Sequence, residues 1–173
     1  MFARNSMKVP ILAALLLLAS ALRAKDVSVC EVAPLPKGIY QVSSPFGPRV
    51  HPLSHVWRMH WGIDLKCPVG TPVSAVSNGV VLFAGRWGCY GNVVILYHPG
   101  EIITLYAHLS RIFPGLCRGV RVRAGQVIAL SGATGCVTGP HVHFECWLGS
   151  QRRRVNPVLV CAPLCITHGR VRL

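Results

Sequence analysis

Short β-type runs recur through most of this 173-residue chain, and no segment keeps a helical period. Valine, isoleucine and aromatic residues dominate the runs, and Gly, Pro or Asn separates them, which is typical of closely spaced strands. With so little helical pattern, we expect one all-β domain, a compact antiparallel sheet. The clearest runs are PVSAV (72–76), GVVLFAG (79–85), NVVILYH (92–98), IITLYAHL (102–109), QVIALSG (126–132) and HVHFECWL (141–148).

The length of the chain suits a single domain, and its 51% hydrophobic residues are enough for a real core. We expect this domain to span residues 40–160. A short Pro-containing lead-in, residues 25–39, precedes it, and a basic, Cys-containing tail, residues 161–173, follows.

The first 24 residues have the layout of a secretory signal peptide. Arg4 and Lys8 precede the apolar run Ile11–Leu22, and small residues follow around a possible cleavage point. A membrane span needs roughly 20 apolar residues, so the run is short for an uncleaved anchor. We therefore expect an exported protein, in the periplasm or cell envelope, with no stable membrane insertion after signal removal.

The chain is strongly basic, with a formal net charge of +13. Residues 1–24 hold three of the 18 basic residues and none of the five acids, so the remainder carries 15 minus 5, or +10. Such a surface attracts nucleic acid, acidic membranes or an acidic cell wall. Export argues against nucleic acid, and we find no basic amphipathic element suited to membranes.

All eight cysteines lie after the signal-like segment, at positions 30, 67, 89, 117, 136, 146, 161 and 165. An even number of cysteines in an exported chain indicates disulfides, so we expect few or no free thiols. Eight cysteines allow 105 pairings, and the sequence does not choose among them. Only Cys161 and Cys165 are close together, which disfavours a structural zinc site made of thiolates.

The segment TGPHVHFE places two imidazoles in a predicted strand. His141 and His143 should share one face, about 6.6 Å apart at ~3.3 Å per residue, with Glu145 next along that face. The pair is equally consistent with a metal or catalytic site and with a partly buried strand that tolerates polar side chains. Glu145 suits a hydrogen bond to a ligand histidine or a place on the surface, and we leave it out of the predicted site.

The segment MHWGIDLKCP adds His60 and Asp64. In a straight strand their backbones would lie ~13 Å apart, too far for one zinc ion, so the chain must bend between them. Gly62 permits such a bend. Taken alone, each residue would be read as an ordinary strand-end or turn residue.

His108, at the end of the run LYAHLS, is a further candidate, although a lone histidine there is usually an ordinary polar residue. His51, His55 and His98 stand beside Pro or Gly, and we interpret them as loop residues. His168 lies in the tail and receives no role.

Several separated motifs, in this order, resemble the lysostaphin/LytM-type zinc metalloendopeptidase family. The similarity covers about Ser44 to Pro157. It implies an antiparallel β-sheet with an open groove, export, and hydrolysis of peptide bonds in peptidoglycan by zinc-activated water. The motifs are SPFGPRVHP, HWGIDLKCPVGTPVSAVSNGVVLFAG, YGNVVILYH, TLYAHLS, GQVIALSGATG, TGPHVHFE and VNP.

The resemblance also implies roles. His60, Asp64 and His143 match the metal ligands, for one Zn²⁺ per chain, and His108 and His141 match the catalytic histidines. We expect His141 to act as the general base and a protonated His108 to stabilise the developing oxyanion.

Three classes of function stay open at this point. The first is an active peptidoglycan endopeptidase, and the second is a non-catalytic wall-binding or hydrolase-activating relative. The third is a cationic protein that acts on membranes. For the enzyme, we expect cleavage between stem peptides, from D-alanine to a diamino acid, with a glycine cross-bridge as the alternative.

The cysteines depart from the family pattern, and the lead-in 25–39 is the only local candidate to cover the groove.

Overall fold

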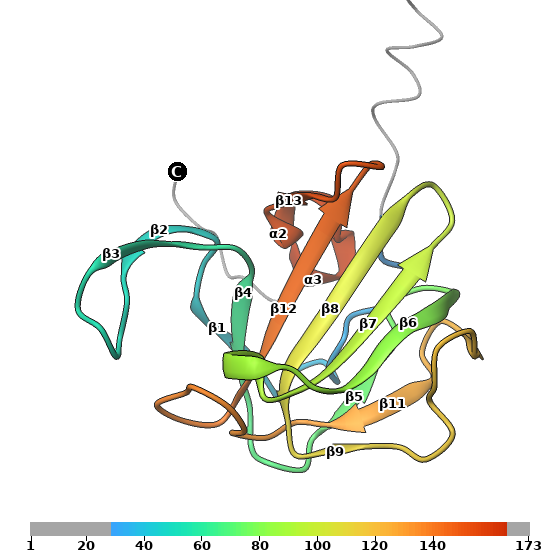
Figure 1. Cartoon of the computed structure of the whole chain (residues 1–173), viewed down its shortest axis with the longest axis horizontal. Coiled ribbons are helices and arrows are strands. Elements are labelled where there is room, and N and C mark those ends of the chain that lie inside the picture. Colours follow the sequence, from blue (N-terminus) through green and yellow to red (C-terminus); the bar gives the residue numbers. More distant parts are fainter. Residues whose placement is uncertain (1–28, 166–173) are drawn as a thin grey trace, which may run out of the picture.

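A computed structural model describes residues 29–165, with only the backbone of Cys165. The predicted signal peptide and His168 fall outside these residues. The described chain is built almost entirely of strands (Figure 1). The strands are β1 (Gln41–Ser44), β2 (Gly47–Val50), β3 (Trp57–His60), β4 (Ile63–Lys66), β5 (Pro72–Ser74), β6 (Gly79–Arg86), β7 (Asn92–His98), β8 (Ile102–Leu109), β9 (Arg111–Ile112), β10 (Arg121–Val122), β11 (Val127–Leu130), β12 (His141–Leu148) and β13 (Arg153–Val155). One 3-10 turn, η1 (Gly88–Tyr90), and two single-turn helices, α2 (Pro157–Val160) and α3 (Ala162–Cys165), complete it.

Three sheets make up the domain, and every strand pair is antiparallel. The main sheet has the order β1-β4-β12-β8-β7-β6-β10, with β13 added beside β12. A smaller sheet has the order β5-β11-β9, and β2 and β3 form a hairpin that projects from the main sheet (Figure 1). The prediction of an all-β antiparallel fold is confirmed.

All six β-type runs of the sequence contain strands. Three of them, 92–98, 102–109 and 141–148, have the same bounds as β7, β8 and β12. These three adjacent strands form the middle of the main sheet. The run 79–85 lies within β6, which is eight residues long. The other strands are two to four residues long, too short to show a period of their own.

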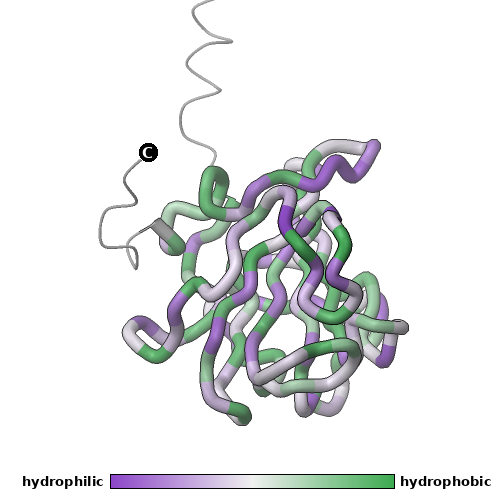
Figure 2. Tube along the Cα trace, turned by 90° about the vertical axis from the view of Figure 1, so that its left-hand side faces the viewer, coloured by the Kyte–Doolittle hydropathy of each residue, from purple (hydrophilic) through white to green (hydrophobic). Residues whose placement is uncertain are grey.

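The main sheet is buried on both faces at its centre. One face carries the larger core, where Leu65, Tyr106 and Phe144 are fully buried. On the other face a smaller cluster includes Leu105, Ala107 and Trp147. Every residue of β8 is buried, as expected for a central strand covered on both sides. Hydrophobic and hydrophilic stretches are interspersed along the described chain (Figure 2).

The lead-in packs against the domain. Val29 and Leu35 are buried in the larger core, and the Val29 amide donates to the Val160 carbonyl at 2.7 Å. A disulfide joins Cys30 to Cys161. Residues 29–39 are therefore held on the core, together with the start of the tail.

The expectation of few or no free thiols is wrong for the described cysteines. Two disulfides form, Cys30–Cys161 and Cys89–Cys136, while Cys67, Cys117 and Cys146 are free. Cys146 stays free because Cys30 and Cys146 both lie beside Cys161. The Sγ of Cys146 is 3.7 Å from that of Cys161, which is already bonded to Cys30. That bond also removes two of the three thiolates that a metal at Cys30, Cys146 and Cys161 would need.

Membrane-spanning helices are absent between residues 29 and 165, where no helix has the length and apolar character to cross a bilayer.

Candidate metal centre and catalytic cleft

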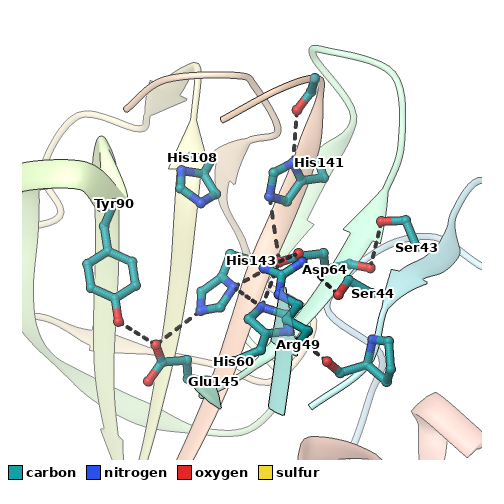
Figure 3. Close-up of polar contacts among 12 residues, drawn as sticks. Ser43, Ser44, Arg49, His60, Asp64, Tyr90, His108, His141, His143 and Glu145 are labelled. Atoms are coloured by element: carbon teal, nitrogen blue, oxygen red, sulfur yellow. Dashed lines mark hydrogen bonds and ion pairs between the residues drawn. The ribbon is translucent and has the colours of Figure 1, made fainter. Parts of the chain in front are cut away.

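Three side chains from β3, β4 and β12 converge on one point (Figure 3). Between His60 and Asp64 the backbone bends at Gly62, as predicted. Across the sheet, Asp64 pairs directly with His143, so these two side chains share a face. His60 Nε2, Asp64 Oδ1 and His143 Nδ1 lie 2.9 to 3.1 Å from one another.

The geometry fits a tetrahedral zinc ion. Zn–N and Zn–O bonds of about 2 Å place neighbouring ligand atoms about 3.3 Å apart, close to the observed separations. Two imidazoles and one carboxylate leave a fourth position for water, as in catalytic zinc sites. These residues could therefore hold a metal ion.

The ligand atoms are oriented by contacts on their far sides. His60 Nδ1 donates to the Pro45 carbonyl at 2.7 Å, which leaves Nε2 toward the centre. Asp64 turns Oδ1 to the histidines and Oδ2 to Arg49, 3.2 Å away. Such outer contacts are usual around metal ligands because they fix the ring orientation. No role was predicted for Arg49, although it stands in one of the family motifs.

The charges of the site favour a cation. Burial opposes ionisation of Asp64, but hydrogen bonds with His143 and His60 outweigh it, so the pKa of Asp64 falls far below its usual range. Burial likewise opposes protonation of His143, yet the carboxylates of Asp64 and Glu145 outweigh it and raise the pKa of His143. The centre therefore attracts positive charge, which a metal ion would supply in place of a proton.

Glu145 belongs to this centre, and a surface position for it is wrong. Its side chain is 0% exposed, and Oε1 lies 3.0 Å from His143 Nε2. Burial raises the pKa of Glu145, but hydrogen bonds from His143, Tyr90 and Trp147 bring it to about 2. The i, i+2 spacing of His143 and Glu145 was the signal for this contact. No role was predicted for Tyr90, although it begins the family motif YGNVVILYH.

His108 reaches the site through an irregularity in β8. Between Tyr106 and Leu109, two residues of β8 stand opposite the single residue Val93 of β7, which is a β-bulge. His108 has φ +61°, a conformation that non-glycine residues rarely adopt. Regular alternation would point His108 away from the face of Ala107, and the bulge redirects it. Its ring lies 4.8 Å from that of His141 and 5.9 Å from that of His143, centroid to centroid.

His141 stands at the start of β12 beside the metal ligands. Its Nδ1 donates to the Gly139 carbonyl at 2.8 Å, and its Nε2 lies 3.6 Å from Asp64 Oδ1. His108 is held in the same way, with Nδ1 2.9 Å from the Thr134 carbonyl. In the neutral forms both Nδ1 atoms carry the proton, so both Nε2 atoms keep a lone pair. Figure 3 shows the two imidazoles on the same side of the cluster.

The five residues line one cleft of about 1030 Å³. The β2–β3 hairpin forms one wall, and the segment 136–140 before β12 contributes to another. The Cys89–Cys136 disulfide ties that segment to the turn η1, and both cysteines line the cleft. Residues 29–39 of the lead-in do not line it, so the described part of the lead-in does not cover the groove.

The remaining histidines divide into two groups. His51 and His55 flank a turn in the β2–β3 hairpin, as predicted. The loop assignment of His98 is wrong, because His98 ends β7 and is 1% exposed. Its Nδ1 lies 2.9 Å from the Asn78 carbonyl and its Nε2 2.8 Å from Thr104 Oγ1.

An antiparallel β-sheet with two histidines and one aspartate at a cleft, beside two more histidines, defines a metallopeptidase type of site. Residues 58–157 match the model of peptidase family M23, and the chain belongs to that family. The family resemblance read from the motifs is confirmed.

Similar proteins support this assignment. The chain is 50% identical over 123 residues to the DD-carboxypeptidase/endopeptidase Mpg of Neisseria meningitidis, covering 71% of this chain and 27% of the relative. A zinc-containing peptidase from Vibrio cholerae matches with TM-score 0.65 and 37% identity, over 72% of this chain and 37% of that one. The catalytic domain of lysostaphin from Staphylococcus simulans matches with TM-score 0.63 and 31% identity, over 71% of this chain and 92% of that one. The chain thus spans about a quarter of the length of the Neisseria relative.

Proposed function

We propose that the protein is a zinc endopeptidase that hydrolyses peptide bonds in peptidoglycan, with one Zn²⁺ per chain. The observation that carries this proposal is the triangle of His60 Nε2, Asp64 Oδ1 and His143 Nδ1, with the imidazoles of His108 and His141 beside it. Three ligands and two free imidazoles in one cleft suit hydrolysis by activated water.

Each part of the chain has a separate task in this proposal. Zinc, when bound, would lower the pKa of a water molecule from 15.7 toward ~7 and polarise the scissile carbonyl. His141 Nε2, close to the metal ligands, takes a proton from the attacking water as general base. The proton then passes to the amine nitrogen that leaves when the C–N bond breaks.

His108 differs from the expectation in its resting charge. Burial, together with the neighbouring His141, lowers the pKa of His108 to about 4. The side chain is therefore neutral at neutral pH rather than protonated, and a bound cation would lower its pKa further. His108 can donate a hydrogen bond from Nε2 to the developing oxyanion only after it gains a proton. In this proposal it takes the second proton of the attacking water once the new C–O bond has formed, and it gives that proton up when the C–N bond breaks, so that the amine leaves as an ammonium group.

The proposed bond is that between stem peptides, from D-alanine to a diamino acid. The Neisseria relative is named a DD-carboxypeptidase/endopeptidase. Arg58 and Lys66 line the cleft, and neither pairs with a carboxylate among residues 29–165. Stem peptides carry carboxylates that these cations could bind, whereas a glycine cross-bridge is uncharged.

The proposed location is the periplasm or cell envelope, after removal of the signal peptide at residues 1–24. Two disulfides support it, because such bonds persist in oxidising compartments. Peptidoglycan, and not nucleic acid, is the proposed partner.

A digestion experiment tests the proposal. The purified zinc-loaded protein is incubated with muropeptides of known cross-link, and the products are identified by mass spectrometry, with Asp64→Asn as the inactive control. We expect cleavage of D-alanyl cross-links and none of glycine bridges. Cleavage of glycine bridges alone would overturn the proposed bond. Binding to wall without any cleavage would favour the non-catalytic alternative.

A further inference from the structure

Glu145 is a fully buried carboxylate with four hydrogen-bond donors around it. His143 Nε2 and Tyr90 Oη reach Oε1 at 3.0 and 2.6 Å. Trp147 Nε1 and Arg154 Nε reach Oε2 at 2.6 and 2.9 Å. A buried charge is tolerated when it is paired and hydrogen-bonded, and this one is satisfied on both oxygens.

The contact with His143 determines which ring nitrogen carries the proton. An ionised carboxylate has only acceptors, so His143 Nε2 must donate to Glu145. In a neutral imidazole the other nitrogen, Nδ1, then keeps its lone pair. That atom is the one that lies 2.9 Å from Asp64 Oδ1 and 3.0 Å from His60 Nε2. The opposite tautomer would point a proton at the metal position.

Tyr90 holds the carboxylate in place from the cleft side (Figure 3). Its ring stacks on Trp87, with centroids 5.4 Å apart, and lies 5.7 Å from the ring of His143. Against a carboxylate its hydroxyl can only donate. Tyr90 closes the turn η1, which the neighbouring Cys89–Cys136 disulfide fastens to the segment before β12.

From these contacts we infer that Glu145 and Tyr90 are positioning residues, which fix the orientation and tautomer of His143 and thereby set the metal affinity of the centre. This inference rests on the proposed function only in taking His143 as a zinc ligand. The competing account is purely structural: Glu145 would pair with Arg154 to stabilise the fold, with no effect on metal binding.

Zinc affinity separates the two accounts without any measurement of activity. We expect Glu145→Gln to weaken zinc binding about 10–100-fold in competition with a chromophoric chelator, the usual effect of losing an outer-shell partner. The glutamine amide nitrogen of this variant is itself a donor. It cannot accept the hydrogen bonds that the Glu145 carboxylate now accepts. Tyr90→Phe removes only the hydroxyl and should weaken binding in the same direction.

Tyr106→Phe is the matched control. It removes another buried hydroxyl, one that accepts from the Val76 amide in the core, and should leave zinc affinity unchanged. Thermal unfolding of each metal-free variant reports the structural effect separately. Nitrogen-15 NMR of the metal-free protein, titrated upward from pH 8 until the His143 ring is neutral, should show the remaining ring proton on Nε2 in the wild type, and a mixture of tautomers in Glu145→Gln.

Wild-type zinc affinity in Tyr90→Phe and in folded Glu145→Gln would overturn the inference, whatever their thermal stability. If Glu145→Gln does not fold, Tyr90→Phe and the tautomer of the wild-type protein decide. Tight zinc binding without peptidoglycan hydrolysis in the wild type would overturn the proposed function but leave this inference standing. A wild-type protein that binds no zinc would overturn both.

Discussion

His143 Nδ1 lies 2.9 Å from Asp64 Oδ1, and the two residues face each other directly across β12 and β4. The metal centre is therefore built on strands of the main sheet, and the register of that sheet sets the distance between two of its ligands. A change that moves β4 away from β12 should act on metal affinity and on stability together.

Substitution of Gly62 is such a change. A Cβ at Gly62 would clash with the Phe144 carbonyl oxygen and lie 2.9 Å from both His143 Cε1 and Glu145 Cγ. We expect Gly62→Ala to destabilise the protein by about 1–3 kcal/mol, typical of overpacking. Zinc affinity should fall about tenfold or more, as for other disturbed ligand surroundings. Denaturant unfolding and chelator competition measure the two effects.

A glycine inside a strand serves as the control. A Cβ at Gly85 in β6 would meet only the Phe83 ring tip, at 3.3 Å. Gly85→Ala should therefore keep zinc affinity and nearly all stability. Equal losses of zinc affinity and of stability in the two variants would show that the site does not require the close approach at Gly62.

The Cys89–Cys136 disulfide should stabilise the cleft. Removing both sulfurs, in Cys89→Ser/Cys136→Ser, should cost about 2–4 kcal/mol of unfolding free energy.

In the wild type, thiol labelling under denaturing, non-reducing conditions should mark Cys67, Cys117 and Cys146. Peptide mapping by mass spectrometry checks this, and labelled Cys89 or Cys136 in protein from the exported fraction would contradict the pairing.

Sequence patterns predicted the long central strands because these strands are covered on both faces and so read as nearly continuous hydrophobic runs. The spacing of His141 and His143 likewise placed both on one face of β12. The position of His108 could not be predicted in this way, since it depends on a bulge opposite Val93 and a positive φ. The same holds for Tyr90 and Arg49, whose contacts join segments far apart in the chain. Burial of Glu145 and His98 depended on neighbouring strands that the sequence pattern did not reveal.

His98 should make the stability of the protein sensitive to mild acid. Burial lowers the pKa of His98, so the unfolded chain, with a histidine pKa of about 6.5, takes up the proton more readily. The stability linked to His98 is therefore fully present above about pH 6.5 and is lost as the pH falls below that value. Unfolding free energies of the wild type and His98→Gln, measured from pH 8 to pH 5, test this.

His98→Gln should show a smaller loss of stability over that range than the wild type. His55→Asn, at an exposed turn position with positive φ that asparagine tolerates, is the control and should follow the wild type. A pH dependence in His98→Gln as steep as that of the wild type would assign the acid sensitivity to other groups.

The central claim is that His60, Asp64 and His143 bind zinc while His108 and His141 act on the reaction. It is tested most directly by metal content and wall-hydrolysis rate measured together for alanine variants of all five. The three ligand variants should lose zinc and activity, because two protein donors remain. His141→Ala should keep nearly stoichiometric zinc and slow about 10²–10⁴-fold, and His108→Ala should keep zinc and slow about 10²–10³-fold. Loss of zinc from His141→Ala with retention by His143→Ala would reverse the assignment within β12, and full activity in all five variants would contradict the enzyme itself.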